Sequence, residues 1–125
     1  MALSLQTRIC DDVTVIDVAG RLTLGESATS LRETLKQITA GGVLKILLNL
    51  RDLSFIDSSG LGELASGHAN LRQKGGAVKL AAPPKRVLEL LQITGLVRVI
   101  EVYETEADAF HNWTSRGVRT GESRR

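Results

Sequence analysis

The segment from Val43 to Leu50 constrains the fold more than any other part of the chain. Only Lys45 and Asn49 interrupt its apolar run, which lies between a glycine pair and the charged pair at 51–52. Such a short apolar run is typical of a strand in the middle of a sheet, where both faces are covered. The segment therefore predicts a central β-strand that packs on both sides.

Further strands and helices alternate around this central strand. Apolar and polar residues alternate over 3–9, and a β-branched run follows at 13–18, so these segments predict a hairpin. Two later strands are predicted at 77–82 and 97–103. Apolar residues at three- and four-residue steps predict four helices, which contain residues 28–38, 59–74, 83–94 and 105–113.

The predicted order is β-β-α-β-α-β-α-β-α, which indicates an α/β fold. Strands that alternate with helices through short glycine-marked links form a mostly parallel sheet, and the first hairpin adds an antiparallel N-terminal edge. We expect a single domain over residues 1–115, with about four helices flanking the central sheet. Residues 116–125 contain few apolar side chains and are expected to form a disordered tail.

Composition excludes several classes of protein. No apolar run approaches the roughly 20 residues that cross a bilayer, and the start of the chain does not have the pattern of a secretory signal. Cys10 is the only cysteine, which fits a cytoplasmic protein without disulfides. The net charge of +2 resides in the tail: residues 1–115 carry 12 basic and 13 acidic side chains, a net of −1. We therefore expect neither nucleic-acid binding nor membrane insertion.

The segment from Asp52 to Gly62 is the strongest candidate for a functional site. It connects the central strand to a helix, the position where α/β sheets usually place their sites. Asp57, Ser58 and Ser59 are all preferred residues at helix starts, so they could simply cap the helix. Alternatively, a phosphate on a serine here would meet free N–H groups and the positive end of the helix dipole. The residues alone leave capping and a phosphorylation switch as equal alternatives.

Two glycines in the first turn of the predicted helix need a separate explanation. Gly60 and Gly62 each cost about 1 kcal/mol relative to alanine inside a helix. A glycine lets another group approach the backbone closely, because it has no side chain. The two glycines therefore favour a surface at which another chain or a phosphate comes near the helix start.

The run from Leu50 to Gly62, with its Asp-Leu-Ser-Phe and Asp-Ser-Ser-Gly-Leu-Gly segments, closely resembles the signature of STAS-domain anti-sigma-factor antagonists. The resemblance covers nearly the whole chain before the tail and implies a STAS-like fold. In that family the serine after the aspartate is phosphorylated, which is Ser58 here. The resemblance also implies a partner-contact surface that includes Asp57, Ser59, Gly60, Leu61 and Gly62.

The resemblance implies a cycle with two partners and no cofactor. The unphosphorylated antagonist binds an anti-sigma factor with serine-kinase activity and so frees the sigma factor. The kinase then uses ATP to phosphorylate the antagonist, which dissociates until a serine phosphatase restores it. We expect the antagonist itself to be a monomer.

The loop after the second strand departs from the family pattern. Antagonists of this type often have an acidic residue there that contributes to recognition of the kinase, whereas this chain has Thr23 and Leu24. Glu26 is the alternative source of the acidic group, from a shifted loop. The identity of the partner is therefore open. A second role on the same fold also remains possible, as a docking subunit of a lipid-trafficking ABC transporter or of a stress-signalling scaffold, without phosphorylation.

No residue pattern predicts an enzyme or a metal site. No nucleophile or ligand set surrounds His68 or His111, and the Gly-x-Ser-x-Gly and Gly-Lys-Ser/Thr patterns are missing. We predict that both histidines are packed or surface residues. The chain is accordingly expected to have no catalytic residue, no metal and no cofactor.

Overall fold

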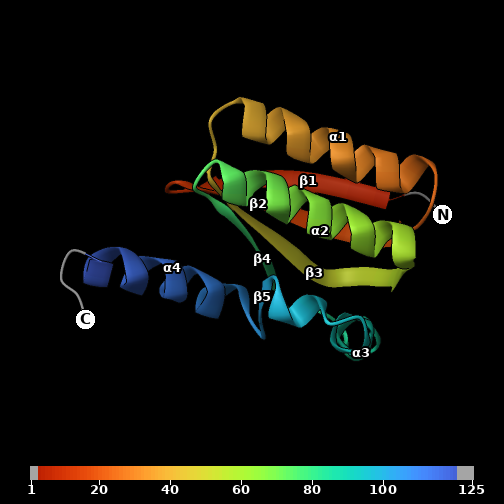
Figure 1. Cartoon of the computed structure of the whole chain (residues 1–125). Coiled ribbons are helices and arrows are strands. Elements are labelled where there is room, and N and C mark those ends of the chain that lie inside the picture. The colour runs from red at the N-terminus through yellow and green to blue at the C-terminus, as the bar shows by residue number, and fades with distance from the viewer. Residues whose placement is uncertain (1–2, 121–125) are drawn as a thin grey trace.

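The computed structural model describes residues 3–120, and its elements follow the predicted order (Figure 1). The strands are β1 (Leu3–Cys10), β2 (Val13–Leu22), β3 (Lys45–Ile56), β4 (Ala77–Ala81) and β5 (Glu101–Tyr103). The helices are α1 (Glu26–Ala40), α2 (Ser58–Gln73), α3 (Lys85–Ile93) and α4 (Glu106–Thr120), with a short 3-10 helix, η1 (Leu96–Arg98), before β5.

All five strands form one sheet in the order β1-β2-β3-β4-β5. β1 pairs with β2 in antiparallel orientation, and β2 to β5 are parallel to one another. The prediction of a mostly parallel sheet with an antiparallel N-terminal edge is confirmed. Because the parallel strands point the same way, the segments that follow β2 and β3 leave the sheet at one edge, which we call the carboxyl edge.

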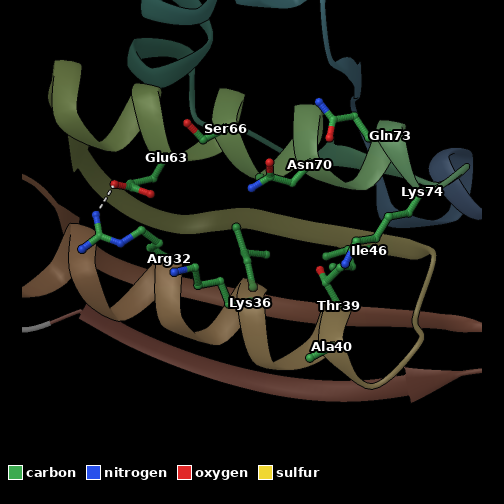
Figure 2. Close-up of a pocket in the computed structure, with 12 residues that line it drawn as sticks. Arg32, Lys36, Thr39, Ala40, Ile46, Glu63, Ser66, Asn70, Gln73 and Lys74 are labelled. Carbon is green, nitrogen blue, oxygen red and sulfur yellow. Dashed lines mark hydrogen bonds and ion pairs between the residues drawn. The ribbon is translucent and has the colours of Figure 1, made fainter.

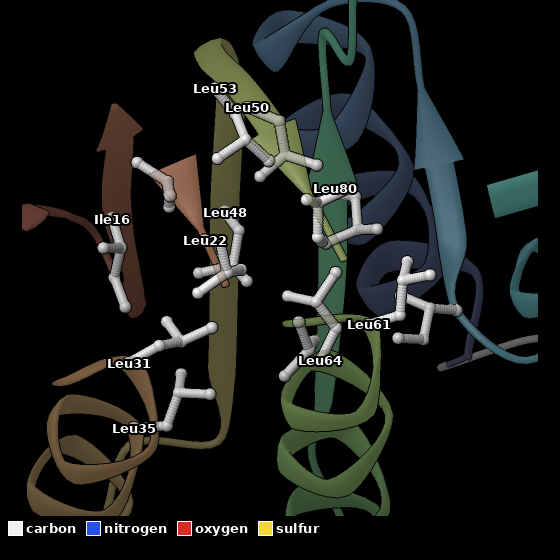
Figure 3. Packing of buried hydrophobic residues seen from close by; sticks show 14 of the residues in the cluster. Ile16, Leu22, Leu31, Leu35, Leu48, Leu50, Leu53, Leu61, Leu64 and Leu80 are labelled. Atoms are coloured by element: carbon white, nitrogen blue, oxygen red, sulfur yellow. The ribbon is translucent and has the colours of Figure 1, made fainter. Parts of the chain in front are cut away.

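Each face of the sheet has its own apolar cluster. Ile46, Leu48 and Leu50 of β3 belong to the larger cluster, to which α1, α2 and α3 contribute apolar side chains. Figure 3 shows part of this cluster, with Leu31 of α1 and Leu64 of α2. Leu47 points to the other face and belongs to a smaller cluster with Trp113 of α4. The predicted central strand is therefore confirmed as one that is covered on both sides.

β3 is longer than the sequence prediction. It runs on to Ile56, past the charged Arg51 and Asp52 at which the predicted strand ended. The reason is that β2 stays paired with it as far as Leu22, through two irregularities in the register that bend the ladder. This extension carries the end of β3 to the start of α2.

β5 is shorter than the predicted strand at 97–103. After Gly95, which has a left-handed φ of 79°, residues Leu96–Arg98 form η1 instead of a strand. Pairing with β4 begins only at Glu101, opposite Lys79. Leu96 and Ile100 pack against the core, whereas Val97 and Val99 are exposed, so the predicted strand start was wrong.

Helix α4 extends to Thr120 and includes residues 116–120 of the segment predicted to be a tail. Residues 121–125 of that segment lie outside the described part of the chain. The amino end of α4 is held by Glu106, which accepts hydrogen bonds from Arg8 of β1 and from Asn49 of β3. Arg8 also pairs with Asp17 of β2 at 2.7 Å. This network joins α4 to three strands.

Lys79 of β4 fixes the same helix from the interior and is only 1% exposed. Its Nζ lies 3.0 Å from a carboxylate oxygen of Glu101, donates to Asn112 Oδ1 at 2.9 Å and lies 4.5 Å from the ring centroid of Trp113. A buried ammonium group is tolerated only with such compensation. Lys79 therefore connects β4 to β5 and α4.

We predict that Lys79→Ala lowers the free energy of unfolding by about 3 kcal/mol, because it leaves a cavity and removes a buried ion-pair partner. Urea denaturation followed by Trp113 fluorescence would measure the loss. Lys45→Ala is the matched control, since Lys45 pairs with Asp12 at the surface, and it should change stability by less than about 1 kcal/mol. Equal effects of the two substitutions would contradict the role given to Lys79.

Candidate functional site

The candidate site lies at the carboxyl edge, where the segments after β2 and β3 meet. Leu22 and Ile56 are register partners at the ends of these strands, and the Asp57 N–H donates to the Leu22 carbonyl oxygen at 3.2 Å. Helices α1 and α2 both begin at this edge, side by side (Figure 1). The two predicted site segments, 23–24 and 57–62, are thus brought together although they lie more than thirty residues apart.

Asp57 connects the two segments through its carboxylate. Oδ1 accepts a hydrogen bond from the Gly60 N–H at 3.0 Å, which caps α2, and Oδ2 accepts one from the Leu24 N–H at 2.9 Å. These backbone N–H groups of Leu24 and Gly60 hold the pKa of the Asp57 carboxyl below its usual range. Asp57 therefore acts as a helix cap and as a tie to the neighbouring loop.

This geometry assigns different positions to the three residues that were candidates for the cap. Asp57 is the N-cap, with extended backbone, and Ser58 is the first residue of α2. Ser58 is exposed, whereas Ser59 is half-buried. Because Asp57 provides the cap, the Ser58 hydroxyl is not required for that purpose.

The loop that contains Thr23 and Leu24 is held at several points. The Thr23 N–H donates to Ser27 Oγ at 2.8 Å, and the Thr23 carbonyl accepts from the Ala28 N–H at 3.1 Å. Ser27 was not a candidate in the sequence analysis. Its four-residue spacing from Thr23, at the start of a helix, is the signal that could have identified it.

The two glycines of α2 have different surroundings. A Cβ on Gly60 would lie 2.6 Å from the Leu22 carbonyl oxygen and 2.8 Å from Ile56 Cγ1, whereas a Cβ on Gly62 would meet nothing within 4 Å. The group that approaches Gly60 is therefore the end of β2 in the same chain. Gly62 is exposed, so a second molecule could approach its backbone.

The predicted contact residues thus lie at different depths. Ser58, Gly62 and Leu24 are exposed, and Asp57, Ser59 and Thr23 are half-buried. Gly60 is buried, and Leu61 is only 8% exposed and belongs to the core. Gly60 and Leu61 consequently support the surface from beneath, by fixing the start of α2 against the sheet.

The two histidines lie away from this surface. His68 of α2 is buried, and its Nδ1 accepts the Val78 N–H at 3.2 Å, while burial lowers the pKa of its imidazole. His68 therefore joins α2 to β4 as a packed residue. His111 is exposed on α4. Over residues 3–120, no three His, Cys, Asp or Glu side chains gather as they would around a metal ion.

A groove of about 560 Å³ lies between α1 and α2 (Figure 2). Arg32 of α1 and Glu63 of α2 close the end near the site with an ion pair of 3.0 Å. Leu35 and Ile46 form part of its floor, and Gly67 lets Leu35 approach α2 closely. Residues of α2 between Glu63 and Gln73 line one side of the groove, whereas Ser58 does not line it.

Comparison with known proteins places this geometry in a family. Residues 4–109 match the family model described as the STAS domain. An anti-sigma-B factor antagonist of Bacillus subtilis (strain 168) is 32% identical over 87 residues, which cover 70% of this chain and 78% of that protein. None of the helices in residues 3–120 is both long and apolar enough to cross a membrane.

Solved structures with the same fold agree. The crystal structure of a Thermotoga maritima protein with a proposed anti-sigma factor antagonist role has a TM-score of 0.81 and 28% identity, covering 86% of this chain and 92% of that one. The structure of the Bacillus cell fate determinant SpoIIAA in its phosphorylated form has a TM-score of 0.68 and 25% identity, covering 89% and 98%. The predicted STAS-like fold is confirmed.

The contrast between the two glycines gives a prediction for stability. Gly60→Ala should lower the free energy of unfolding by about 1–3 kcal/mol, because the methyl group overlaps the backbone of β2. Gly62→Ala should leave it unchanged or raise it by up to about 1 kcal/mol, since the position is open and alanine favours a helix. Urea denaturation of both variants would test this, and equal effects would contradict the packing described.

The tie formed by Asp57 gives a prediction for pH dependence. Its folded-state pKa is depressed, so its contribution is complete above the ordinary pKa of about 3.9 and is lost as pH falls through the folded-state pKa. Asp57→Ala should therefore lower the urea midpoint at neutral pH, and its difference from the unsubstituted chain should shrink below about pH 4. A difference that is constant from pH 7 to pH 3 would show that the carboxylate charge plays no part.

Proposed function

Because this chain belongs to the STAS-domain family and, within it, to the anti-sigma factor antagonists, we propose that phosphorylation of Ser58 controls its binding to a partner. The unmodified chain binds an anti-sigma factor with serine-kinase activity and so frees a sigma factor. Phosphorylation of Ser58 by that kinase ends the binding, and a serine phosphatase restores it. The chain is then a protein substrate and a binding module of the cytoplasm.

The observation that carries this proposal is the position of Ser58. Its hydroxyl is exposed at the first position of α2, while the neighbouring Asp57 supplies the helix cap. Modification of Ser58 would therefore leave both hydrogen bonds of Asp57 in place. A serine that capped the helix itself would lose this role on phosphorylation.

The chemistry requires only that the kinase reach this hydroxyl. Ser58 Oγ attacks the γ-phosphorus of ATP bound to the kinase, the bond from that phosphorus to the β,γ-bridging oxygen breaks, and ADP leaves. The hydroxyl proton passes to a base of the kinase. In the reverse branch, water attacks the phosphorus of the phosphoserine on the phosphatase, the bond from phosphorus to Ser58 Oγ breaks, inorganic phosphate leaves, and Ser58 Oγ regains a proton.

Electrostatics explains how one phosphate could change binding without unfolding the chain. It adds about −1.5 to −2 charges at neutral pH. The amino end of α2 carries a partial positive charge, which favours an anion there in the free chain. Inside a complex the same charge would lose its water and would disrupt the packing of the partner against Ser58 and Gly62.

We predict that Ser58→Ala retains the partner and cannot be phosphorylated, and that Ser58→Asp folds normally but binds at least about tenfold more weakly, because its charge persists in the complex. The anti-sigma kinase from the same cells would be purified and its affinity measured by calorimetry, with phosphopeptide mass spectrometry after incubation with ATP. Ser59→Ala is the control and should still be phosphorylated at Ser58.

Two results would overturn the proposal in different ways. Phosphate on Ser59 alone would move the acceptor to the neighbouring residue. A chain that is unmodified in growing and stressed cells, and that co-purifies with a transporter ATPase, would assign the same surface to docking without phosphorylation.

A further inference from the structure

We propose that Leu24 is the apolar anchor of the partner-binding surface, and that the anti-sigma factor receives it in an apolar pocket. This inference rests on the proposed function and specifies the chemistry of the partner at that site. It concerns a side chain that neither the core nor the helix cap requires, since Leu24 is 78% exposed.

The backbone beneath this exposed side chain is rigidly held. The Leu24 N–H donates to Asp57 at 2.9 Å, and the preceding residue, Thr23, is fixed by hydrogen bonds with Ser27 and Ala28. An apolar side chain on a fixed backbone loses little conformational freedom when it enters a pocket. Leu24 is therefore presented to a partner in a defined position.

Most residues next to Leu24 at the carboxyl edge are small and uncharged, and the exception is the exposed Glu26, which begins α1. Thr23 and Gly25 flank Leu24 in the loop, and Ser58 and Gly62 lie one turn apart on the exposed face of α2. The carboxylate of Asp57, which accepts the Leu24 N–H, also accepts the Gly60 N–H, so both its oxygens have a backbone partner. The centres of protein interfaces are depleted in charge and contain apolar anchors that fill pockets, which is the character of this surface.

This position of Leu24 also couples the anchor to the switch. Ser58 follows Asp57, whose carboxylate holds the Leu24 backbone, so a phosphate on Ser58 would lie beside the anchor. A partner that closes an apolar pocket over Leu24 would have to desolvate that phosphate as well. A partner that instead placed a basic side chain here would gain an ion pair on phosphorylation, opposite to the proposed release.

The exposed Ile9 offers a matched control. Its side chain is 79% exposed and similar in size to that of Leu24. Ile9 pairs with Thr14 near the start of β2, whereas Leu24 lies in the loop beyond the other end of that strand. Any general effect of removing an exposed apolar side chain should be the same at both positions. Only a docking role for Leu24 should make the Kd of Leu24→Ala differ from that of Ile9→Ala.

The test uses the full chain and the purified serine-kinase anti-sigma factor from the same cells. Leu24→Ala should raise the Kd at least tenfold with an unchanged unfolding midpoint, and Leu24→Met should stay within about threefold of the unsubstituted chain, because methionine also fits an apolar pocket. Ile9→Ala should stay within about twofold. Ser58→Asp is measured in parallel to report the switch.

The outcomes separate this inference from the proposed function. If Leu24→Ala binds as tightly as the unsubstituted chain while Ser58→Asp does not, the anchor is refuted and the switch stands. If Leu24→Asp binds more tightly than the unsubstituted chain, the partner offers a basic group and the apolar pocket is refuted. If the unsubstituted chain does not bind the kinase at all, both the proposed function and the anchor fail.

Discussion

The carboxylate of Asp57 is the interaction on which the candidate site depends. One oxygen accepts the Gly60 N–H and starts α2, and the other accepts the Leu24 N–H and fixes the loop after β2. Without this second bond, two segments from different parts of the chain would meet only through the ends of β2 and β3. With it, Ser58 and Leu24 become parts of one surface whose geometry is set before any partner arrives.

The order of strands and helices could be predicted because short-range patterns of apolar residues indicate each element. A nearly continuous apolar run identified β3, and periodic apolar residues identified the helices in their correct order. The lengths of β3 and β5 could not be predicted in the same way. β3 extends through Arg51 and Asp52 because β2 remains beside it, and β5 is shortened by the left-handed turn at Gly95, so both depend on contacts between distant residues.

The site was predictable in part for the same reason. The run from Asp57 to Gly62 was identified as a candidate site because capping residues and glycines occur together there. The reason for the glycines could be predicted only in part. Gly60 was interpreted as room for another chain or a phosphate, whereas the structure places the end of β2 against it. The link from Asp57 to Leu24 joins segments that no local pattern relates.

The charged groups that stabilise the fold lie apart from the proposed switch at Ser58. On the far side of the sheet, Arg8 holds α4 through an ion pair with Glu106, and the buried Lys79 holds it through Asn112 and the ring of Trp113. Neither residue is part of the carboxyl edge. At that edge, an anion at a helix start gains about 0.3–1 kcal/mol in the free chain, whereas burying it unpaired in an interface costs several kcal/mol. Because of the difference between these two free energies, a phosphate on Ser58 could weaken binding without destabilising the free chain. It would be accepted by the folded chain and rejected by the complex.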